Sequence, residues 1–197
     1  DLEISLERKV KLMNDANCFT LSEAVDGAGK NFKSIFGIII GTGFGGGLSY
    51  KKEIIEGANQ IAGDWGHQPL PYPTDEEIKT KINCPSMNCG RPLCAEQFMS
   101  GVGFSTIFNN KNNTNLSSEE IVELDNKNDE RANSEFKLYE DRMARLIAVM
   151  IGIYDPDAII LGGGMSNVDR LYNNIPTLIP KYTFSNIVKT KVLKNFH

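Results

Sequence analysis

The sequence has 197 residues, and 41% of them are hydrophobic, which is enough to build the core of one large domain. The formal net charge is −4 and the basic residues are scattered, so we expect no nucleic-acid partner. No apolar run reaches the length of a membrane span and no signal peptide is evident, so we expect a cytoplasmic protein that does not bind a membrane.

The first thirty residues predict a short strand followed by a helix. Residues 1–13 fit both an alternating strand pattern and a helical spacing, and residues 10–13 have the composition of a short strand. Asn14 and Asp15 come next, and both favour the start of a helix, which we expect to extend to about Val25. An Asp just after a strand could act as a general base toward a substrate hydroxyl, or it could only cap the helix, which is the commoner role.

The central feature is a buried strand that runs into a glycine-rich stretch. Residues 35–40 are almost all apolar and predict the strand. Glycine lets backbone N–H groups approach an anion closely, so phosphate is the expected ligand of the loop. No Lys-Ser or Lys-Thr pair of a nucleotide P-loop follows, and residues 48–50 continue as a strand, so we expect the turn of a β-hairpin. A glycine-rich turn without a ligand is the alternative. The residues expected in this loop are Gly41, Thr42, Gly43, Gly45, Gly46 and Gly47.

The rest of the chain predicts helices and two further strands, which gives a mixed α/β architecture. Apolar residues recur at steps of three and four from Asp129 to Asp155 and predict a long helix. The other expected elements are a glycine-interrupted helix over 95–108, a helix capped by 117–120, strands at 158–161 and 187–193, and a helix over 168–179.

A second glycine turn, Gly162 to Gly164, follows the strand at 158–161. A strand, a glycine turn and a helix start together form a common nucleotide contact. We expect Gly163 and Gly164 to clamp the same nucleotide as the first loop, although a simple tight turn is an equally good interpretation of this motif alone.

One histidine and three cysteines form the only possible metal set away from the chain ends. His67 precedes Cys84, Cys89 and Cys94, and one His with three Cys is a ligand set of structural zinc. Buried free thiols are the alternative, because cysteine is often buried. A zinc site would hold Glu96, two residues after Cys94, where it could present its carboxylate to a polyol; otherwise Glu96 is a solvated helix residue.

The combined motifs resemble the ROK family of sugar kinases and related repressors. The turn at 162–167 and the segment 100–104 are most similar to the fructokinase and mannokinase branch of that family. The resemblance extends over nearly the whole chain from about Lys11. The motifs that carry it are Asn14 to Asn17, Gly41 to Gly47, Gly57 to Asn59, Gly63 to His67, Cys89 to Glu96, and Asp155 to Gly164.

The resemblance implies an actin-like ATPase fold of the ribonuclease H type, mostly its carboxy-terminal lobe. Residues 1–30 would be a remnant of the amino-terminal lobe and the inter-lobe connection, and residues 31–197 the kinase domain, with a zinc-binding insertion at about 67–96. The resemblance also implies that Asp15 is the catalytic base, that the Gly41 to Gly47 stretch holds the phosphates of ATP with Mg, and that the cysteines bind structural zinc. We expect a homodimer. The sugar ligands implied are Asn14, Asp64, His67 and Glu96.

The sequence departs from the family pattern at several positions. Asp64 stands where the family usually has Glu, Met87 stands where the first cysteine belongs, and Leu93 replaces a glycine. The Asp-x-Gly-x-Thr phosphate hairpin of the amino-terminal lobe is missing and the chain begins with Asp1, so we expect a carboxy-terminal portion that is inactive alone.

The function expected from these residues is ATP-dependent phosphorylation of a hexose, with fructose or mannose favoured. One alternative is a sugar-sensing repressor of the same family, whose DNA-binding domain this chain would lack. Another is a non-catalytic sugar-binding module. Asp15 favours the kinase, because a repressor needs no base.

Overall fold

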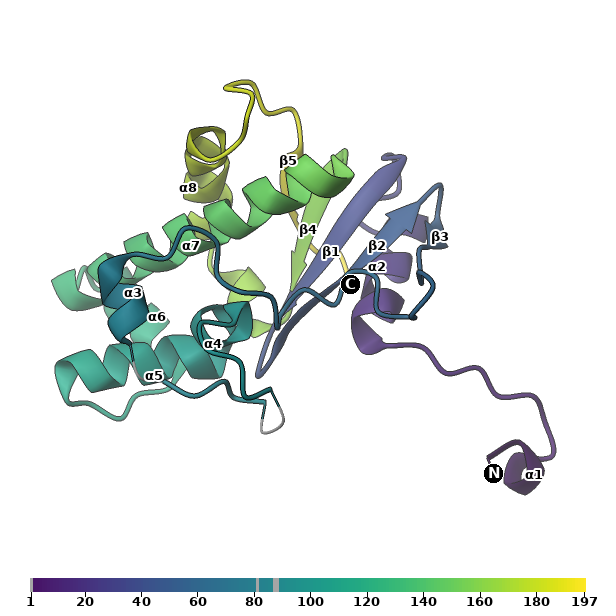
Figure 1. Ribbon diagram of the computed structural model, residues 1–197, viewed down its shortest axis with the longest axis horizontal. Helices are drawn as coiled ribbons and strands as arrows, with labels where there is room; N and C mark the ends of the chain where they lie inside the picture. Colours follow the sequence, from purple (N-terminus) through teal and green to yellow (C-terminus); the bar gives the residue numbers. More distant parts are fainter. Residues whose placement is uncertain (1, 81, 87–88) are drawn as a thin grey trace.

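The computed structural model describes residues 2–80, 82–86 and 89–197, and these residues form a mixed α/β fold around a twisted sheet (Figure 1). The sheet has five strands in the order β3-β2-β1-β4-β5. β1 pairs antiparallel with β2 and parallel with β4, and β4 pairs parallel with β5. The predicted α/β class is therefore confirmed. The strands are β1 (Ser34–Ile40), β2 (Phe44–Tyr50), β3 (Glu53–Ile54), β4 (Ala158–Gly162) and β5 (Lys191–Lys194).

The strongest helix predictions are confirmed, because the caps named in the sequence are made. Asn14 caps the second helix by accepting a hydrogen bond from the Ala16 N–H, and Asp129 caps the long helix. Ser117 and Glu120 form a reciprocal capping box. The α-helices are α1 (Leu2–Leu6), α2 (Asp15–Val25), α3 (Asp75–Lys79), α4 (Ala95–Met99), α5 (Gly101–Asn112), α6 (Ser118–Asn126), α7 (Glu130–Tyr154) and α8 (Arg170–Leu178); the 3-10 helices are η1 (Gly164–Asn167) and η2 (Ile179–Lys181).

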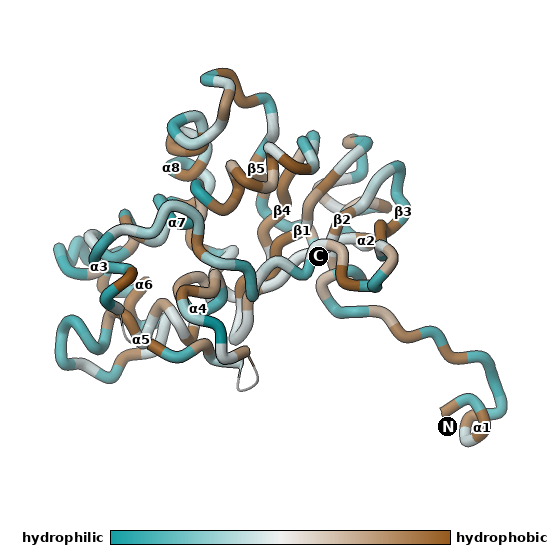
Figure 2. The backbone as a smooth tube through the Cα atoms, viewed as in Figure 1, coloured by the Kyte–Doolittle hydropathy of each residue, from teal (hydrophilic) through white to brown (hydrophobic). Residues whose placement is uncertain are grey.

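The two faces of the sheet bury different layers, as the alternation of side chains along a strand requires. Phe36, Ile38 and Ile40 of β1 belong to the large core that includes α4, α5, α7 and α8. Ile35 faces the other way and packs with Ala24 of α2. Figure 2 shows the hydrophobic colour concentrated along β1 and β4 in the middle of the sheet.

Several element predictions are wrong or only approximate. Residues 10–13 form no strand, and α1 buries none of its residues; residues 2–13 extend away from the sheet (Figure 1). The interruption expected in the helix over 95–108 is confirmed, because Ser100 ends α4 and caps α5 through the Gly103 N–H at 3.0 Å, but α5 continues beyond the expected end to Asn112. β5 is shorter than expected because residues 187–190 run without a strand partner.

None of the helices in the described ranges has the length and apolar character needed to cross a membrane.

A buried ion network joins the short α3 to the long α7, and the sequence analysis did not predict it. Glu77 of α3 contacts both Arg142 and Arg145 of α7, and all three side chains are almost completely buried. The network fixes the start of the segment that carries the cysteines, because α3 directly precedes it.

Candidate functional site

The loop between β1 and β2 is shorter than predicted. It contains only residues 41–43 and is closed by a hydrogen bond from the Gly41 N–H to the Gly43 carbonyl at 3.0 Å. Gly45, Gly46 and Gly47 lie in β2, so the expectation that they belong to the loop is wrong. Packing is the physical reason: a Cβ on Gly47 would lie 2.7 Å from side-chain atoms of α2, and a Cβ on Gly46 would lie 2.7 Å from the Phe36 ring.

The two glycine turns meet at one edge of the sheet, as contact with a shared nucleotide would require. β1 and β4 are parallel neighbours, with Ile39 opposite Gly162, so the turns that follow them lie side by side. Gly163 has φ +83°, and a Cβ there would lie 2.5 Å from the Ile40 carbonyl oxygen, so this close turn requires glycine. Gly41, Thr42 and Gly164 line one cleft of about 460 Å³, together with the first turns of α5 and α6.

Asp15 lies at the exposed amino-terminal end of α2. The Ala16 N–H is shared by Asn14 Oδ1 at 2.9 Å and Asp15 Oδ1 at 2.8 Å. Asn14 is the capping residue, so Asp15 belongs to the first helical turn. In the described part of the chain no hydrogen bond reaches Asp15 Oδ2. This oxygen can therefore accept a hydrogen bond from a ligand hydroxyl, or its proton.

Glu96 is buried and joins the cysteine segment to the hairpin loop. Its Oε2 accepts the Phe44 N–H at 3.1 Å, and its Oε1 accepts the Ser86 hydroxyl at 2.6 Å and the Ser86 N–H at 3.2 Å. Burial raises the pKa of the Glu96 carboxyl, but these hydrogen bonds, with one from Cys84 and the charge of His67, lower the pKa overall. Glu96 is therefore held as a carboxylate, and the interpretation of Glu96 as a solvated helix residue is wrong.

The structure brings the four predicted metal ligands together. The ligand atoms of His67, Cys84, Cys89 and Cys94 all lie within 4.8 Å of one another. A tetrahedral zinc ion with bonds of about 2.3 Å separates its ligands by about 3.8 Å, so a closure of about 1 Å would complete the site. Cys84 is part of the cluster although it lies three residues before the position of the family's first cysteine. Met87, which occupies that position, lies outside the described residues.

The thiols of this cluster differ in their protonation. Burial raises the pKa of the Cys84 and Cys94 thiols, whereas the backbone N–H of Arg91 lowers the pKa of the Cys89 thiol. Binding of a cation would favour the thiolate form of Cys84 and Cys94, which is the form that binds metal. The donor set and its spacing therefore fit zinc.

Backbone pairing places the segment that contains Asp64 and His67 against the turn that leads into α4. The Leu70 N–H bonds to the Leu93 carbonyl at 2.7 Å, and the Glu96 N–H bonds to the Gly66 carbonyl at 2.7 Å. His67, which lies between these two bonds, is half-buried. Asp64, which precedes them, is exposed. Leu93 has φ +56°, a left-handed conformation that explains why the family pattern has glycine there.

Trp65 anchors this segment to the sheet. Its ring packs on Phe36, with centroids 4.8 Å apart, and on Phe44 at 5.2 Å. The hairpin that carries the glycine loop therefore also supports the segment from Asp64 to His67.

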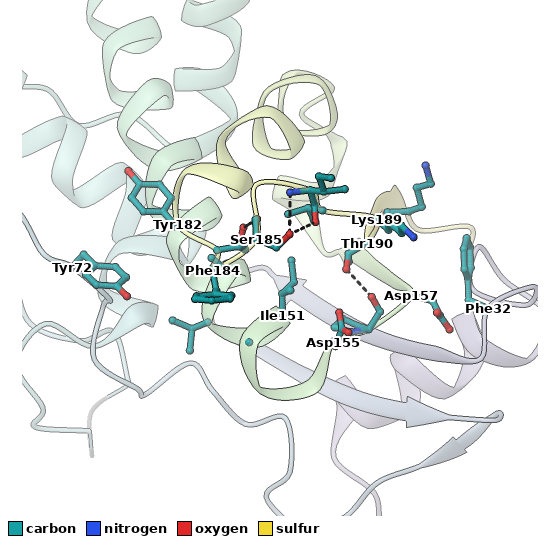
Figure 3. A pocket seen from close by; sticks show the side chains of 18 residues that line it. Phe32, Tyr72, Ile151, Asp155, Asp157, Tyr182, Phe184, Ser185, Lys189 and Thr190 are labelled. Carbon is teal, nitrogen blue, oxygen red and sulfur yellow. Dashed lines mark hydrogen bonds between the residues drawn. The ribbon is translucent and has the colours of Figure 1, made fainter.

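A larger cavity, of about 1030 Å³, lies elsewhere and contains none of the predicted site residues. It is formed at the opposite edge of the sheet, where β4 and β5 begin, and Asp155, Phe184 and Thr190 line it (Figure 3). Its size alone does not make it the functional site, because the metal-ligand cluster and the cleft at the glycine turns lie elsewhere.

Sequence reasoning missed Ser86 and the Phe44 N–H, which hold Glu96. It also missed Ser117, the cap of α6, and Ser118 of α6 as residues that line the cleft. Ser117 was recognised only as a helix cap. A carboxylate that is buried needs hydrogen-bond donors, but the sequence does not show which residues supply them.

Comparisons with known proteins agree with this geometry. A family model described as "ROK family" matches residues 1–196. An N-acetyl-D-glucosamine kinase from Vibrio atlanticus (strain LGP32) is 37% identical over 199 residues, and the match covers 100% of this chain and 65% of that protein. This chain thus spans about 65% of the length of that curated relative. The relative's name does not support the fructokinase and mannokinase branch that the motifs resembled.

Two solved structures show the fold at lower identity. A ROK family glucokinase from Streptomyces griseus, in complex with glucose and AMPPNP, matches with a TM-score of 0.83 at 22% identity, covering 99% of this chain and 66% of that one. A ROK family transcriptional regulator, a homolog of the E. coli MLC protein, matches with a TM-score of 0.81 at 18% identity, covering 100% of this chain and 50% of that one. The predicted fold is confirmed, and the chain belongs to the ROK family.

Proposed function

We propose that this chain is the larger part of an ATP-dependent kinase that phosphorylates a hexose hydroxyl. The observation that carries the proposal is the cleft lined by Gly41, Thr42 and Gly164, together with the buried Glu96 carboxylate, which accepts the Phe44 N–H directly after the hairpin loop. Family membership and the curated relative named as a sugar kinase support it.

The phosphates of ATP would lie against the hairpin loop. Thr42 and Gly164 are exposed on the cleft, so their backbone and hydroxyl donors can reach phosphate oxygens. Mg²⁺ arriving with ATP would neutralise part of the phosphate charge. Gly46 and Gly47 are explained by packing, so the proposal assigns the phosphate contacts to residues 41–43 and to the turn at 163–164.

Asp15 would act as the general base. It takes the proton from the sugar hydroxyl as that oxygen forms a bond to the γ-phosphorus, and the bond from this phosphorus to the bridging oxygen breaks to release ADP. Orientation of the hydroxyl and of the γ-phosphate supplies much of the remaining rate enhancement.

Asn14, Asp64, His67 and Glu96 would bind the sugar. Asp64 is shorter by one methylene than the family's usual Glu, so its contact requires a closer approach of the ligand. The name of the curated relative favours N-acetyl-D-glucosamine, while the motif resemblance favours fructose or mannose. The proposal is therefore made for a hexose, and the choice among these sugars is part of the test.

A zinc ion held by His67, Cys84, Cys89 and Cys94 would supply local folding energy and no chemistry. The ion would fix the turn that leads into α4. Glu96, in the first turn of α4, would then keep a constant position relative to the hairpin loop.

The test is phosphoryl transfer by the full-length protein from ATP to N-acetyl-D-glucosamine, fructose, mannose and glucose. We expect turnover of at least one of these hexoses, and a fall of about 10²–10⁴ in kcat for Asp15→Asn with sugar affinity little changed. Asn keeps the shape of Asp, so a variant with full activity would assign Asp15 to the helix end alone.

A sugar-responsive regulator is the second candidate, because a ROK family transcriptional regulator has the same fold. A regulator of this kind would bind sugar without turning it over. Sugar binding by calorimetry without ADP formation, in the full-length protein, would favour it.

A further inference from the structure

The Glu96 carboxylate receives four donors from two separate parts of the chain. Oε2 accepts only the Phe44 N–H among the described residues, at 3.1 Å. Oε1 accepts the Ser86 hydroxyl at 2.6 Å, the Ser86 N–H at 3.2 Å and the Cys84 thiol at 3.4 Å. A carboxylate has about four acceptor positions, two on each oxygen, so Oε1 is fully used and Oε2 is not.

Metal binding changes this set in a defined way. Cys84 bound to zinc would be a thiolate and would have no proton to donate. The two donors of Ser86 then fill both acceptor positions of Oε1. Oε2 keeps the Phe44 N–H and has one position open.

We propose that Ser86 is a positioning residue that locks the Glu96 carboxylate so that only Oε2 accepts a hydroxyl of the bound sugar. This inference rests on the proposed function of the same site. Ser86 contacts no sugar itself; it acts through Glu96. The geometry also makes Glu96 a bridge, because its two oxygens connect the cysteine segment to the first residue of β2.

Removal of the Ser86 hydroxyl should have two separable effects. One acceptor position on Oε1 becomes empty, so the carboxylate can turn about its Cγ–Cδ bond and its contacts through Oε2 weaken. The Phe44 N–H should then exchange with solvent faster, and the sugar should bind more weakly. ATP contacts at Thr42 and Gly164 should not change, because neither residue touches Glu96 in the structure.

The experiment compares Ser86→Ala, Ser86→Thr and Ser134→Ala in the zinc-loaded full-length protein. Thr keeps the hydroxyl, and Ser134 is an exposed serine of α7 that serves as the matched control. The first readout is hydrogen exchange of the Phe44 amide by NMR. The Gly41 amide, which bonds to Gly43 in the same loop, is the internal reference.

We expect Phe44 exchange to rise about tenfold in Ser86→Ala relative to Gly41, and to stay near the wild-type rate in the other two variants. The second readout is steady-state kinetics with the hexose that the protein turns over. We expect the KM for the sugar to rise about tenfold in Ser86→Ala, with kcat, the KM for ATP and the zinc content unchanged.

Three results would overturn the proposal. One is Phe44 exchange that does not respond to Ser86→Ala. Another is loss of kcat at constant sugar KM, which indicates a smaller folded fraction rather than a displaced carboxylate. The third is loss of zinc, which would make Ser86 a structural part of the metal site. If no hexose is phosphorylated by the wild type, the proposed function fails, while the Phe44 exchange still decides whether Ser86 orients Glu96.

Discussion

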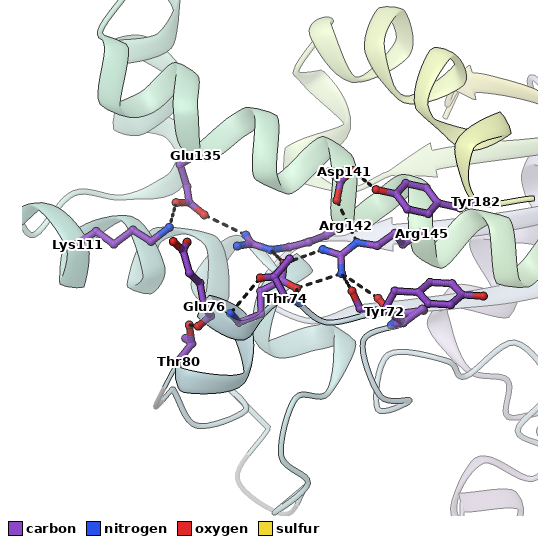
Figure 4. A network of polar contacts seen from close by, with 12 residues as sticks. Tyr72, Thr74, Glu76, Thr80, Lys111, Glu135, Asp141, Arg142, Arg145 and Tyr182 are labelled. Carbon is purple, nitrogen blue, oxygen red and sulfur yellow. Dashed lines mark hydrogen bonds and ion pairs between the residues drawn. The ribbon is translucent and has the colours of Figure 1, made fainter.

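Replacing Glu77 by Gln should destabilise the protein strongly, because Glu77 is the shared anion of two buried arginines, Arg142 and Arg145. Figure 4 labels both arginines within their polar network. Glu77 Oε1 lies 2.8 Å from Arg142 Nε and 2.7 Å from Arg145 Nη2, and Glu77 Oε2 accepts the Thr74 N–H at 2.8 Å. Gln has nearly the same shape but no charge. The variant would therefore leave both guanidinium groups buried with less compensation.

The expected loss can be estimated in two ways. Burial alone raises the pKa of Glu77. Hydrogen bonds from Arg145, Thr74 and Arg142 together have the larger effect and lower the pKa from 4.5 to about 2. The difference between these two values corresponds to about 3 kcal/mol of stability. Removal of one partner from a buried ion pair costs about 3–5 kcal/mol in other proteins, which is the same range. Arg142 keeps Glu135, at 3.0 Å, and this contact places the expected loss at the lower end, about 3 kcal/mol.

Urea unfolding of Glu77→Gln and of Glu76→Gln provides the measurement and its control. Glu76 is the exposed neighbour of Glu77 in the same helical turn, so its substitution should change the free energy of unfolding by less than about 1 kcal/mol. The pH dependence gives a second reading. The pKa of Glu77 is lowered in the folded state, so its contribution is fully present above about pH 4.5 and is lost as the pH falls toward 2.

Glu77→Gln should therefore lose this part of the acid dependence as well as stability at neutral pH. Equal unfolding free energies for the two variants at pH 7 would refute the reasoning. They would mean that the arginines are compensated by Glu135, Asp141 and the carbonyls of Pro71 and Tyr72 alone.

Two further predictions concern the metal cluster and the glycines of β2. Cys89→Ser should remove most of the zinc from protein purified without added metal, measured by elemental analysis; zinc retained at full occupancy would contradict the ligand set. Gly47→Ala should cost about 1–3 kcal/mol, because its Cβ would lie 2.7 Å from Asn17 Oδ1 and Thr20 Oγ1. Gly45→Ala, where no atom lies within 4 Å of the Cβ, is the matched control, and similar thermal midpoints for the two variants would exclude the packing role.

Local signals in the sequence were sufficient for the helices whose ends are capped. Asn14, Ser117 and Asp129 each make the bond that their residue type predicts, because a cap depends on only three or four neighbouring residues. The strand predicted at 10–13 failed for the opposite reason. A strand needs a partner, and the apolar residues of that segment have none within the described fold.

The structural roles of individual glycines could not be predicted from the sequence pattern. Gly41 and Gly46 are close together in the same run, but one lies in a loop that lines a cleft and the other lies under the Phe36 ring. The sequence around them does not reveal the difference, because it depends on Phe36 and on α2, which pack from elsewhere in the chain. The buried ion network was missed for a related reason. Arg142 and Arg145 lie beside the apolar stripe of α7, and their partner Glu77 is more than sixty residues away.

The metal cluster and the proposed sugar site are better understood as one structural unit than as two separate elements. Glu96 lies two residues after Cys94. Its carboxylate accepts hydrogen bonds both from the cysteine segment and from Phe44, the first residue of β2 after the glycine loop. A metal that fixed the four ligands would thus act on the hairpin through one side chain. Loss of zinc should then weaken sugar binding without any direct contact between sugar and metal, because the carboxylate that accepts the hydroxyl would lose the support behind it.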